Sequence, residues 1–525
     1  MKKFDFVIVG AGAAGAAAAW SLANKGYSVA CLDRGVWEDP SNLGKTFPEW
    51  EAQRASGHSP IPAIRRSPFD YPIDDSDSPI KVANYNAVGG GTILFSGHFP
   101  RFLRGDFEAH KSPNAKPLWP INYESLLPFF EQNESMMTMA GELGDPYYPE
   151  IRKLNPPVFL GKTGERVIEA FRSFGWHVWP SYAAIETRAS LSGRVHCQNL
   201  GPCNNGCPSK SKSTADEIYI RPALDMGLEM LTESAVSQVI IQNNTAVGVE
   251  YFDKSGKVQS VFGDKVILAA SAIGTPRILL NSQSDHGPGG LANSSEQVGR
   301  NLMMHPTGYA EGLFSEDQDT DKGPQGAFLF SLEGRRLNEE GLNLGYMIQV
   351  LRGVSPISAA KSAFERGDLE FGSGLGIDFD RYYKKQLGMT VVCEDAPRPE
   401  NRVSNSNSNK DRFGVPGVKV NYSLDANSKK LLAHGLRRAK SVLNKLGAET
   451  VVTHAPLKNV GWHAMGTTRM GENPQTSVVG PTGETHDVRN LYIVDSSVFP
   501  SSSVVNPANT IQSVSLYLTE GLSRE

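Results

Sequence analysis

Three glycines near the start of the chain have the spacing of a phosphate-binding turn. Gly10, Gly12 and Gly15 follow the pattern G-x-G-x-x-G directly after an apolar run over residues 6–9. In such a turn the first glycine makes the bend, the second lets a pyrophosphate approach the backbone, and the third lets a helix pack closely against a strand. Asp33 ends a second apolar run and is placed to accept hydrogen bonds from ribose hydroxyls. The expected chemistry is the binding of a dinucleotide.

A second group of reactive residues consists of three closely spaced cysteines. Cys197, Cys203 and Cys207 lie in a loop rich in Gly, Asn and Pro. Thiolates at such spacing are what an iron–sulfur or zinc site needs. Three thiolates suit a three-iron cluster, whereas a fourth ligand for zinc is not obvious, although His196 is adjacent. Free thiols in a tight loop are the other interpretation, and the sequence leaves the alternatives open.

The glycine turn requires a strand, a helix and a second strand to position it. Residues 6–9 and 27–32 have the apolar character of buried strands, and residues 16–22 are rich in helix formers. The N-terminus of this helix would direct free N–H groups and the positive end of its dipole at the phosphates. The Met-Lys-Lys start with a following Ala/Gly-rich segment is similar to a signal peptide, but Asp5 interrupts the apolar region, so no signal is expected.

Apolar periodicity organises the rest of the chain. A Pro- and Ser-rich stretch of about fifty residues follows the first unit and is expected to cross the surface. Residues 310–455 contain mixed alternating segments and are expected to form a second domain. The predicted strands cover residues 229–242, 246–252 and 265–270, and the predicted helices cover residues 122–134, 275–281, 428–446 and 510–522.

Length and composition indicate a globular protein of more than one domain. The 525 residues exceed one ordinary hydrophobic core. A net charge of −4 argues against binding to nucleic acid or to an anionic membrane surface. No apolar run reaches the length of a bilayer span, so no transmembrane segment is expected. Five cysteines, an odd number spread over this length, argue against a disulfide scaffold.

With the C-terminal motifs included, the chain resembles the glucose–methanol–choline (GMC) oxidoreductases, flavoenzymes that oxidise alcohols. The resemblance extends from end to end, and its nearest branch is the bacterial FAD-dependent sugar and polyol dehydrogenase subunits. The matching segments are Gly10 to Gly15 with Asp33, residues 88–92 (VGGGT), 100–102 (PRF), 106–107 (DF), 119–121 (WPI), 269–277 (AASAIGTPR), 298–306 (VGRNLMMHP), 463–471 (HAMGTTRMG), 490–500 (NLYIVDSSVFP) and 506–507 (NP).

The resemblance implies an α/β fold with a discontinuous Rossmann-type FAD-binding domain and a discontinuous substrate domain. Residues 1–104, 205–309 and 455–525 are assigned to the FAD-binding domain. Residues 105–204 and 310–454 are assigned to the substrate-binding or cap domain, built on an antiparallel sheet.

The same resemblance assigns roles to particular residues. His463 is the expected base for the substrate hydroxyl, and Asn506 is expected to bind the substrate oxygen. His305 is interpreted as structural or as supporting the site. Some members bind FAD covalently through a histidine, but Leu94 occupies that position here, which predicts non-covalent FAD. The expected FAD-binding residues are Gly10, Gly12, Ala13, Ala14, Gly15, Asp33, Arg34, Gly90, Gly91, Thr92, Val236, Ala270, Asp495, Ser496, Asn506 and Pro507.

The implied function is the oxidation of an alcohol group of a sugar, polyol or related hydroxylated small molecule. A neutral imidazole suits the base because its ordinary pKa lies near the operating pH, and flavin N5 would take the hydride. Electrons would pass to a non-NAD acceptor, such as a cytochrome-like protein or a small subunit. By resemblance, Cys197, Cys203 and Cys207 would hold a [3Fe–4S] cluster.

Two other functions stay open from the sequence. One is an oxidase that uses O₂ and releases H₂O₂, and the other is a lyase that keeps FAD without redox use. The expected location is the cytoplasm, or the periplasm if a partner carries the signal. The aromatics Phe328, Phe330, Tyr346, Phe371 and Phe379 are candidates for the pocket wall or for the core.

Overall fold

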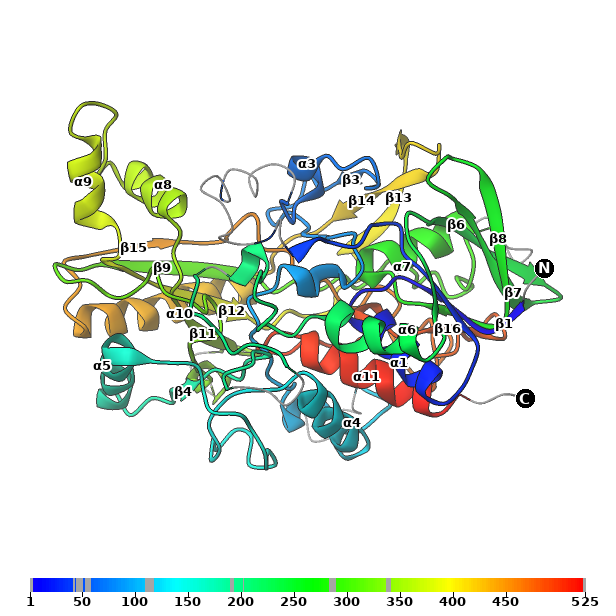
Figure 1. Ribbon diagram of the computed structural model, residues 1–525, viewed down its shortest axis with the longest axis horizontal. Helices are drawn as coiled ribbons and strands as arrows, with labels where there is room; N and C mark the ends of the chain where they lie inside the picture. Colours follow the sequence, from blue (N-terminus) through cyan, green and yellow to red (C-terminus); the bar gives the residue numbers. More distant parts are fainter. Residues whose placement is uncertain are drawn as a thin grey trace.

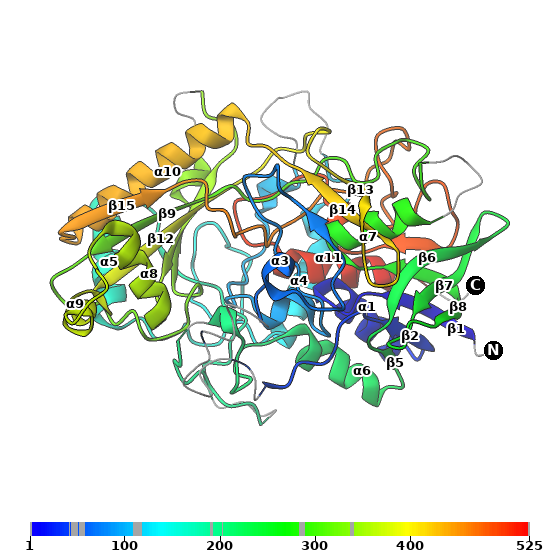
Figure 2. The same ribbon diagram turned by 90° about the horizontal axis from the view of Figure 1, so that it is seen from above.

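The computed structural model has two lobes, each built on its own β-sheet (Figures 1 and 2). The structure describes residues 3–40, 43, 51, 58–108, 118–188, 193–201, 203–282, 289–336 and 341–522. The marked N- and C-termini lie near each other at the outer end of one lobe (Figure 1).

The first lobe contains a seven-stranded mixed sheet in the order β5–β2–β1–β8–β7–β6, with β16 also paired to β8. Its parallel strands are almost fully apolar because both faces of this part of the sheet are covered. Helices α1 (Ala13–Asn24), α11 (Ala508–Glu520) and α4 (Tyr123–Met136) pack in succession beside it. The strands are β1 (Lys3–Val9), β2 (Val29–Leu32), β5 (Glu229–Leu231), β6 (Ala235–Gln242), β7 (Thr245–Phe252), β8 (Val258–Leu268) and β16 (Leu491–Ile493).

The second lobe contains a six-stranded sheet in which every neighbouring pair is antiparallel. Helix α10 (Ala426–Lys445) packs on this sheet, and it begins where the Asp425 side chain accepts a hydrogen bond from the Ser428 N–H at 2.6 Å. In spatial order the strands are β15 (Thr450–His454), β9 (Thr307–Leu313), β12 (Gln386–Cys393), β11 (Tyr346–Leu351), β10 (Leu329–Ser331) and β4 (Trp179–Pro180).

A small third sheet connects to the first lobe. It consists of β13 (Arg402–Lys410), β14 (Pro416–Asn421) and β3 (Ile73–Asp74), and its hairpin packs on α7 (Ser271–Asn281). The buried carboxylate of Asp411 joins the two parts because it pairs with Arg277 at 2.8 Å and with Arg34 at 3.2 Å. The remaining helices are α3 (Pro62–Arg65), α5 (Gly161–Ser173), α6 (Arg221–Asp225), α8 (Pro356–Arg366) and α9 (Leu375–Tyr382).

The predicted fold class is confirmed: an α/β lobe with a mixed sheet stands beside a lobe with an antiparallel sheet. The predicted helices over residues 122–134, 428–446 and 510–522 correspond to α4, α10 and α11. The segment 229–242 forms two strands rather than one, since Glu233 adopts a positive φ of 52° between β5 and β6. Among the described residues, no helix combines the length and apolarity needed to cross a bilayer.

Candidate active site

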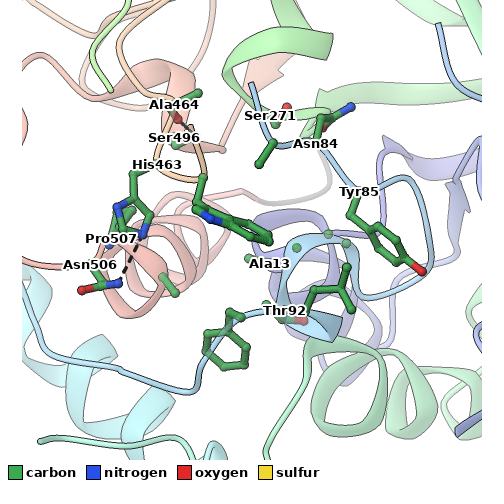
Figure 3. Close-up of a pocket in the computed structure, with 18 of the residues that line it drawn as sticks. Ala13, Asn84, Tyr85, Thr92, Ser271, His463, Ala464, Ser496, Asn506 and Pro507 are labelled. Carbon is green, nitrogen blue, oxygen red and sulfur yellow. Dashed lines mark hydrogen bonds between the residues drawn. The ribbon is translucent and has the colours of Figure 1, made fainter. Parts of the chain in front are cut away.

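A cavity of about 650 Å³ extends from the carboxyl ends of β1 and β2 to one face of the second sheet. Residues of β9, β11 and β12 line its far end, including Tyr309, Gln349 and Thr390. His463, Asn506 and Pro507 lie to one side in Figure 3, whereas Tyr85 and Thr92 lie to the other. A cleft at the carboxyl ends of parallel strands is the usual ligand site of an open α/β sheet.

The glycine turn between β1 and α1 has the close backbone packing that its sequence predicts. A Cβ at Gly10, where φ is +98°, would lie 2.5 Å from the Ala269 carbonyl oxygen. A Cβ at Gly15 would lie 1.8 Å from the Gly10 carbonyl oxygen, so helix and turn touch there. Gly12 has no atom within 3.8 Å of such a Cβ position and faces the cavity. Neighbouring backbone atoms therefore pack against the turn at Gly10 and Gly15, whereas Gly12 faces the cavity without a close neighbour.

A second glycine turn faces the first across a very short gap. Gly90, where φ is +54°, has its Cβ position 2.8 Å from the Cα of Gly12. Thr92 supports this turn because its hydroxyl donates to the Gly89 carbonyl at 2.6 Å and accepts from the Ala215 N–H at 2.9 Å. The two turns together form a narrow backbone cradle lined by N–H groups and small residues.

Two buried carboxylates shape the loops around this cradle. Asp33 accepts hydrogen bonds from the Ala11 and Gly35 N–H groups, each at 2.8 Å. Burial raises the pKa of Asp33, and these two backbone hydrogen bonds oppose that rise. The predicted ribose acceptor therefore lines the cavity and also holds the backbone on both sides of it.

Asp495 plays the same part at the other end of the cradle. One of its oxygens accepts from the Ser271 N–H at 2.9 Å and from the Thr275 hydroxyl at 2.6 Å. Its other oxygen accepts from the Ser497 N–H at 2.8 Å. Burial raises the pKa of Asp495, while its bonds to Ser497 and Thr275 lower it. The carboxylate thereby connects α7 to the loop that follows β16.

His463 and Asn506 meet in the cavity, as the sequence predicts. The Asn506 amide nitrogen lies 3.2 Å from His463 Nε2, and the dashed line between them is drawn in Figure 3. On the other side of the imidazole, His463 Nδ1 lies 3.0 Å from Nδ1 of His305. His305 is almost fully buried and does not line the cavity. The three side chains form one hydrogen-bonded row that begins at the cavity and runs into the core.

Backbone pairing explains why the two histidines meet. Met303 and Met465 exchange both backbone hydrogen bonds, each 3.0 Å long, in an antiparallel bridge. His305 comes two residues after Met303, and His463 comes two residues before Met465. In an antiparallel pairing these two histidines therefore lie opposite one another. Gly466, at a φ of +92°, lets the chain pass the Asn301 carbonyl, 2.5 Å from its Cβ position. The glycine of the HAMG segment is thus needed for the pairing.

Burial keeps the imidazoles neutral. It lowers the pKa of His463 from 6.5 to about 4. It also lowers the pKa of His305 well below its usual range, an effect strengthened by His463 and opposed by the backbone of Ser503. His98, a third histidine on the cavity wall, has its pKa lowered to about 3, mainly by burial. At neutral pH, His463 is therefore an unprotonated base that opens onto the cavity.

Most of the predicted site residues surround this one cavity. His463, Asn506 and all the predicted FAD-binding residues except Gly15 line it. Gly15 instead packs against the turn, which is the role that its spacing predicts. Direct contact of these residues with FAD stays a prediction, as do the predicted domain boundaries.

The five aromatics that the sequence leaves open between pocket wall and core do not line the cavity. Phe328, Phe330 and Tyr346 are fully buried, Phe371 is 86% exposed, and neither these nor Phe379 line the cavity. Aromatic character alone does not show which face of a strand a side chain occupies. The aromatics that do line the cavity are Tyr71, Tyr85, Phe95, Tyr309 and Trp462.

The structure does not support the predicted three-iron cluster. Within the described ranges, no group of three or more His, Cys, Asp or Glu side chains is arranged to hold a metal ion. Each thiol has its own polar neighbour: Asn199 lies 3.9 Å from Cys197, the Gly201 carbonyl lies 3.7 Å from Cys203, and Ser209 lies 3.5 Å from Cys207. Burial raises the pKa of Cys203 to about 12, which favours the thiol over the thiolate ligand.

Comparisons with known proteins identify the family of the chain. Two family models, both described as GMC oxidoreductase, match residues 4–307 and 397–515. The chain is 33% identical to 2-methyl-1,2-propanediol dehydrogenase of Mycolicibacterium austroafricanum, over 99% of this chain and 95% of that protein. It is 25% identical to the fructose dehydrogenase large subunit of Gluconobacter japonicus, over 99% and 97% of the two chains.

A solved structure has a similar fold. The crystal structure of pyridoxine 4-oxidase from Mesorbium loti superposes with a TM-score of 0.65 and covers 98% of both chains at 17% identity. At this level of identity the likeness concerns the arrangement of the two lobes.

Proposed function

The chain belongs to the GMC oxidoreductase family, and from this premise we propose that it is an FAD-dependent dehydrogenase of a sugar, polyol or related hydroxylated small molecule. GMC oxidoreductases bind FAD and act on alcohols and sugars. One observation carries the proposal for this chain. The dinucleotide cradle and the His463–Asn506 pair open onto the same cavity.

The residues of the cradle fit FAD. Gly12 and Gly90 leave no side chain between the backbone and a pyrophosphate, and α1 begins at Ala13 with its free N–H groups at the cavity. Asp33 would hold the ribose. Leu94 is fully buried at the cavity wall and cannot form a bond to the flavin, so we propose that FAD is held non-covalently. When bound, FAD supplies the hydride acceptor.

The chain's own contribution to alcohol oxidation is a positioned base. His463 Nε2 takes the hydroxyl proton of the substrate, because burial keeps this imidazole unprotonated at neutral pH. The Asn506 side chain cannot take the proton away. Its amide nitrogen contacts His463 Nε2 in the structure, and when a substrate hydroxyl takes that place the amide would hydrogen-bond the same oxygen and hold it near Nε2. The Asn506 carbonyl oxygen is buried without a partner among the described residues and is free for a substrate hydroxyl.

Polar groups at the far end of the cavity support a hydroxylated substrate. Gln325, Gln349, Thr390 and Glu311 all line it, and they suit hydroxyl groups better than a long apolar chain. Both named relatives act on polyhydroxylated or diol compounds according to their names. We therefore propose a small diol, polyol or sugar as the substrate.

The electron acceptor is proposed to be a protein partner or a quinone-like molecule rather than NAD. The name of the Gluconobacter relative describes a large subunit, which supports the idea of a further subunit here. Molecular oxygen is the alternative acceptor. Release of H₂O₂ under air at the rate of substrate oxidation would identify an oxidase, whereas turnover with an artificial dye but without H₂O₂ would identify a dehydrogenase.

Anaerobic flavin reduction tests the proposal directly. The purified protein is mixed with a panel of sugars, polyols and simple alcohols, and the flavin absorbance is followed. We expect bleaching by at least one hydroxylated compound, and a loss of at least about 100-fold in the bleaching rate in His463→Ala. Retention of FAD in this variant is the control. A flavin that no alcohol bleaches would contradict the proposed function.

A further inference from the structure

A second histidine lies directly behind the proposed base. His305 precedes β9, and its Nδ1 lies 3.0 Å from Nδ1 of His463, with the rings 4.9 Å apart and inclined at 73°. His305 is 1% exposed and does not line the cavity, so it cannot touch a substrate there. Any effect of His305 on the reaction must therefore act through His463.

The hydrogen bonds around His463 determine which of its nitrogens carries the proton. An amide nitrogen only donates, so the Asn506 amide donates to His463 Nε2, and Nε2 must be the unprotonated nitrogen of the neutral ring. The proton of His463 is then on Nδ1, and it is donated to Nδ1 of His305. His305 in turn carries its own proton on Nε2, and its Nδ1 is the acceptor.

We propose that His305 is the positioning residue of the base: it accepts the Nδ1–H of His463 and so keeps the proton off Nε2, whose lone pair accepts the Asn506 amide until the substrate hydroxyl takes its place. This inference rests on the proposed function. In the reaction, the O–H bond of the alcohol breaks and an N–H bond forms at His463 Nε2; FAD, when bound, would supply the acceptor for the C–H electron pair. The positive charge that develops on His463 is stabilised by the hydrogen bond to His305.

A neutral acceptor differs from a carboxylate in this position. A carboxylate would attract the protonated ring and raise the pKa of the base. His305 is neutral because burial lowers its pKa well below the usual range, and burial also lowers the pKa of His463 to about 4. The ring is thereby oriented without being protonated before the substrate binds.

Other titratable groups lie near the pair and bear on any pH profile. Asp395 accepts hydrogen bonds from the Met304 N–H at 2.9 Å and from the Tyr422 hydroxyl at 2.7 Å, and burial raises its pKa to about 7. If kcat/KM changes with an apparent pKa near 7 and this change is absent in Asp395→Asn, the titrating group is Asp395. The titratable groups on the segments packed around the two histidines are His98, Glu311, Cys393, Glu394, Asp395 and Tyr422.

Three substitutions of His305 separate positioning from simple packing. His305→Leu removes the acceptor, His305→Asn offers an amide oxygen near the position of Nδ1, and His305→Asp offers a charged one. Each variant is purified with FAD, its melting temperature is measured, and kcat, KM and the pH profile of kcat/KM are determined with the alcohol that best bleaches the flavin. The wild-type protein and Asp395→Asn are measured in parallel.

We expect His305→Leu to lower kcat at least about 100-fold with KM changed less than about threefold. His305→Asn should recover most of that loss. His305→Asp should move the acid limb of kcat/KM upward by more than about one pH unit, because a carboxylate favours the protonated base. A packing role alone would move the melting temperature without moving this limb.

An equal loss of kcat in His305→Leu and His305→Asn would overturn the assignment. So would an acid limb of kcat/KM in His305→Asp at the same pH as in the wild-type protein. If His305→Leu does not retain FAD, the pH profiles of the Asn and Asp variants decide alone. A wild-type flavin that no alcohol reduces overturns the proposed function and this inference with it, whereas a normal wild-type reaction with unaffected variants overturns only the inference.

Discussion

The acid limit of activity is the sharpest test of the buried base. Burial lowers the pKa of His463 from 6.5 to about 4, a change of about 3.4 kcal/mol in the cost of protonation. At pH 5.5 a base with this pKa is about 97% unprotonated, whereas an ordinary histidine would be only about 9% unprotonated. We therefore expect kcat/KM at pH 5.5 to be nearly the value at pH 8, instead of roughly one tenth of it.

The assay is the rate of anaerobic flavin reduction between pH 4 and pH 8 at low substrate concentration, in buffers of constant ionic strength. His463 and His98 also make the folded state less stable in acid. Their pKa values are lower in the folded than in the unfolded state, so the unfolded chain binds more protons between about pH 6.5 and pH 4, and stability falls as the pH falls through this range. A pH jump back to 8 before each assay separates this loss from the titration of the base. Half-maximal activity near pH 6.5 in both the wild-type protein and Asp395→Asn, with full recovery after the jump, would refute a base of lowered pKa.

Three further predictions concern the cofactor, the core and the cysteine loop. Gly10→Ala should abolish FAD retention, measured by flavin absorbance, because its Cβ would lie 2.5 Å from the Ala269 carbonyl oxygen, and normal retention would contradict the cradle. Glu134→Gln should destabilise the fold by about 3–5 kcal/mol in denaturant titrations, since it removes the buried counter-charge of Arg101, and a change under about 1 kcal/mol would count against this reading. Cys203 should react with iodoacetamide at pH 8 roughly 1000-fold more slowly than an ordinary thiol, as burial raises its pKa to about 12, and rapid labelling detected by mass spectrometry would contradict a raised pKa of this thiol.

The glycine turn at one end of the cavity was predictable because its sequence signals are local. The residues Gly10 to Gly15 and Asp33 form a contiguous strand–turn–helix–strand unit, so their spacing determines where they lie relative to one another. His463 and Asn506 were identified by family resemblance, and the structure brings them within 3.2 Å. The residues adjacent to His463 and Asn506 in the sequence do not by themselves indicate a base or its amide partner.

Features that depend on distant contacts were predicted less completely. His305 was interpreted as structural or as supporting the site, but its place beside His463 depends on an antiparallel bridge between segments 158 residues apart, and the sequence carries no sign of that register. The spacing of Cys197, Cys203 and Cys207 suits a cluster, but the loop directs the thiols to separate polar neighbours. Spacing gives the reach of a loop, whereas the direction of each side chain depends on the backbone conformation.

The strand order of the first sheet has a consequence during synthesis on the ribosome. Strand β1 pairs with β2 and with β8, and the latter emerges some 250 residues later. At 5–20 residues per second this interval lasts roughly 12–50 s, during which an apolar edge of β1 has no partner. Helix α1 packs against α11, which is synthesised later than β8. The edge of β1 is therefore exposed during much of the synthesis of the chain, and the packing around the glycine turn is complete only after α11 has been synthesised.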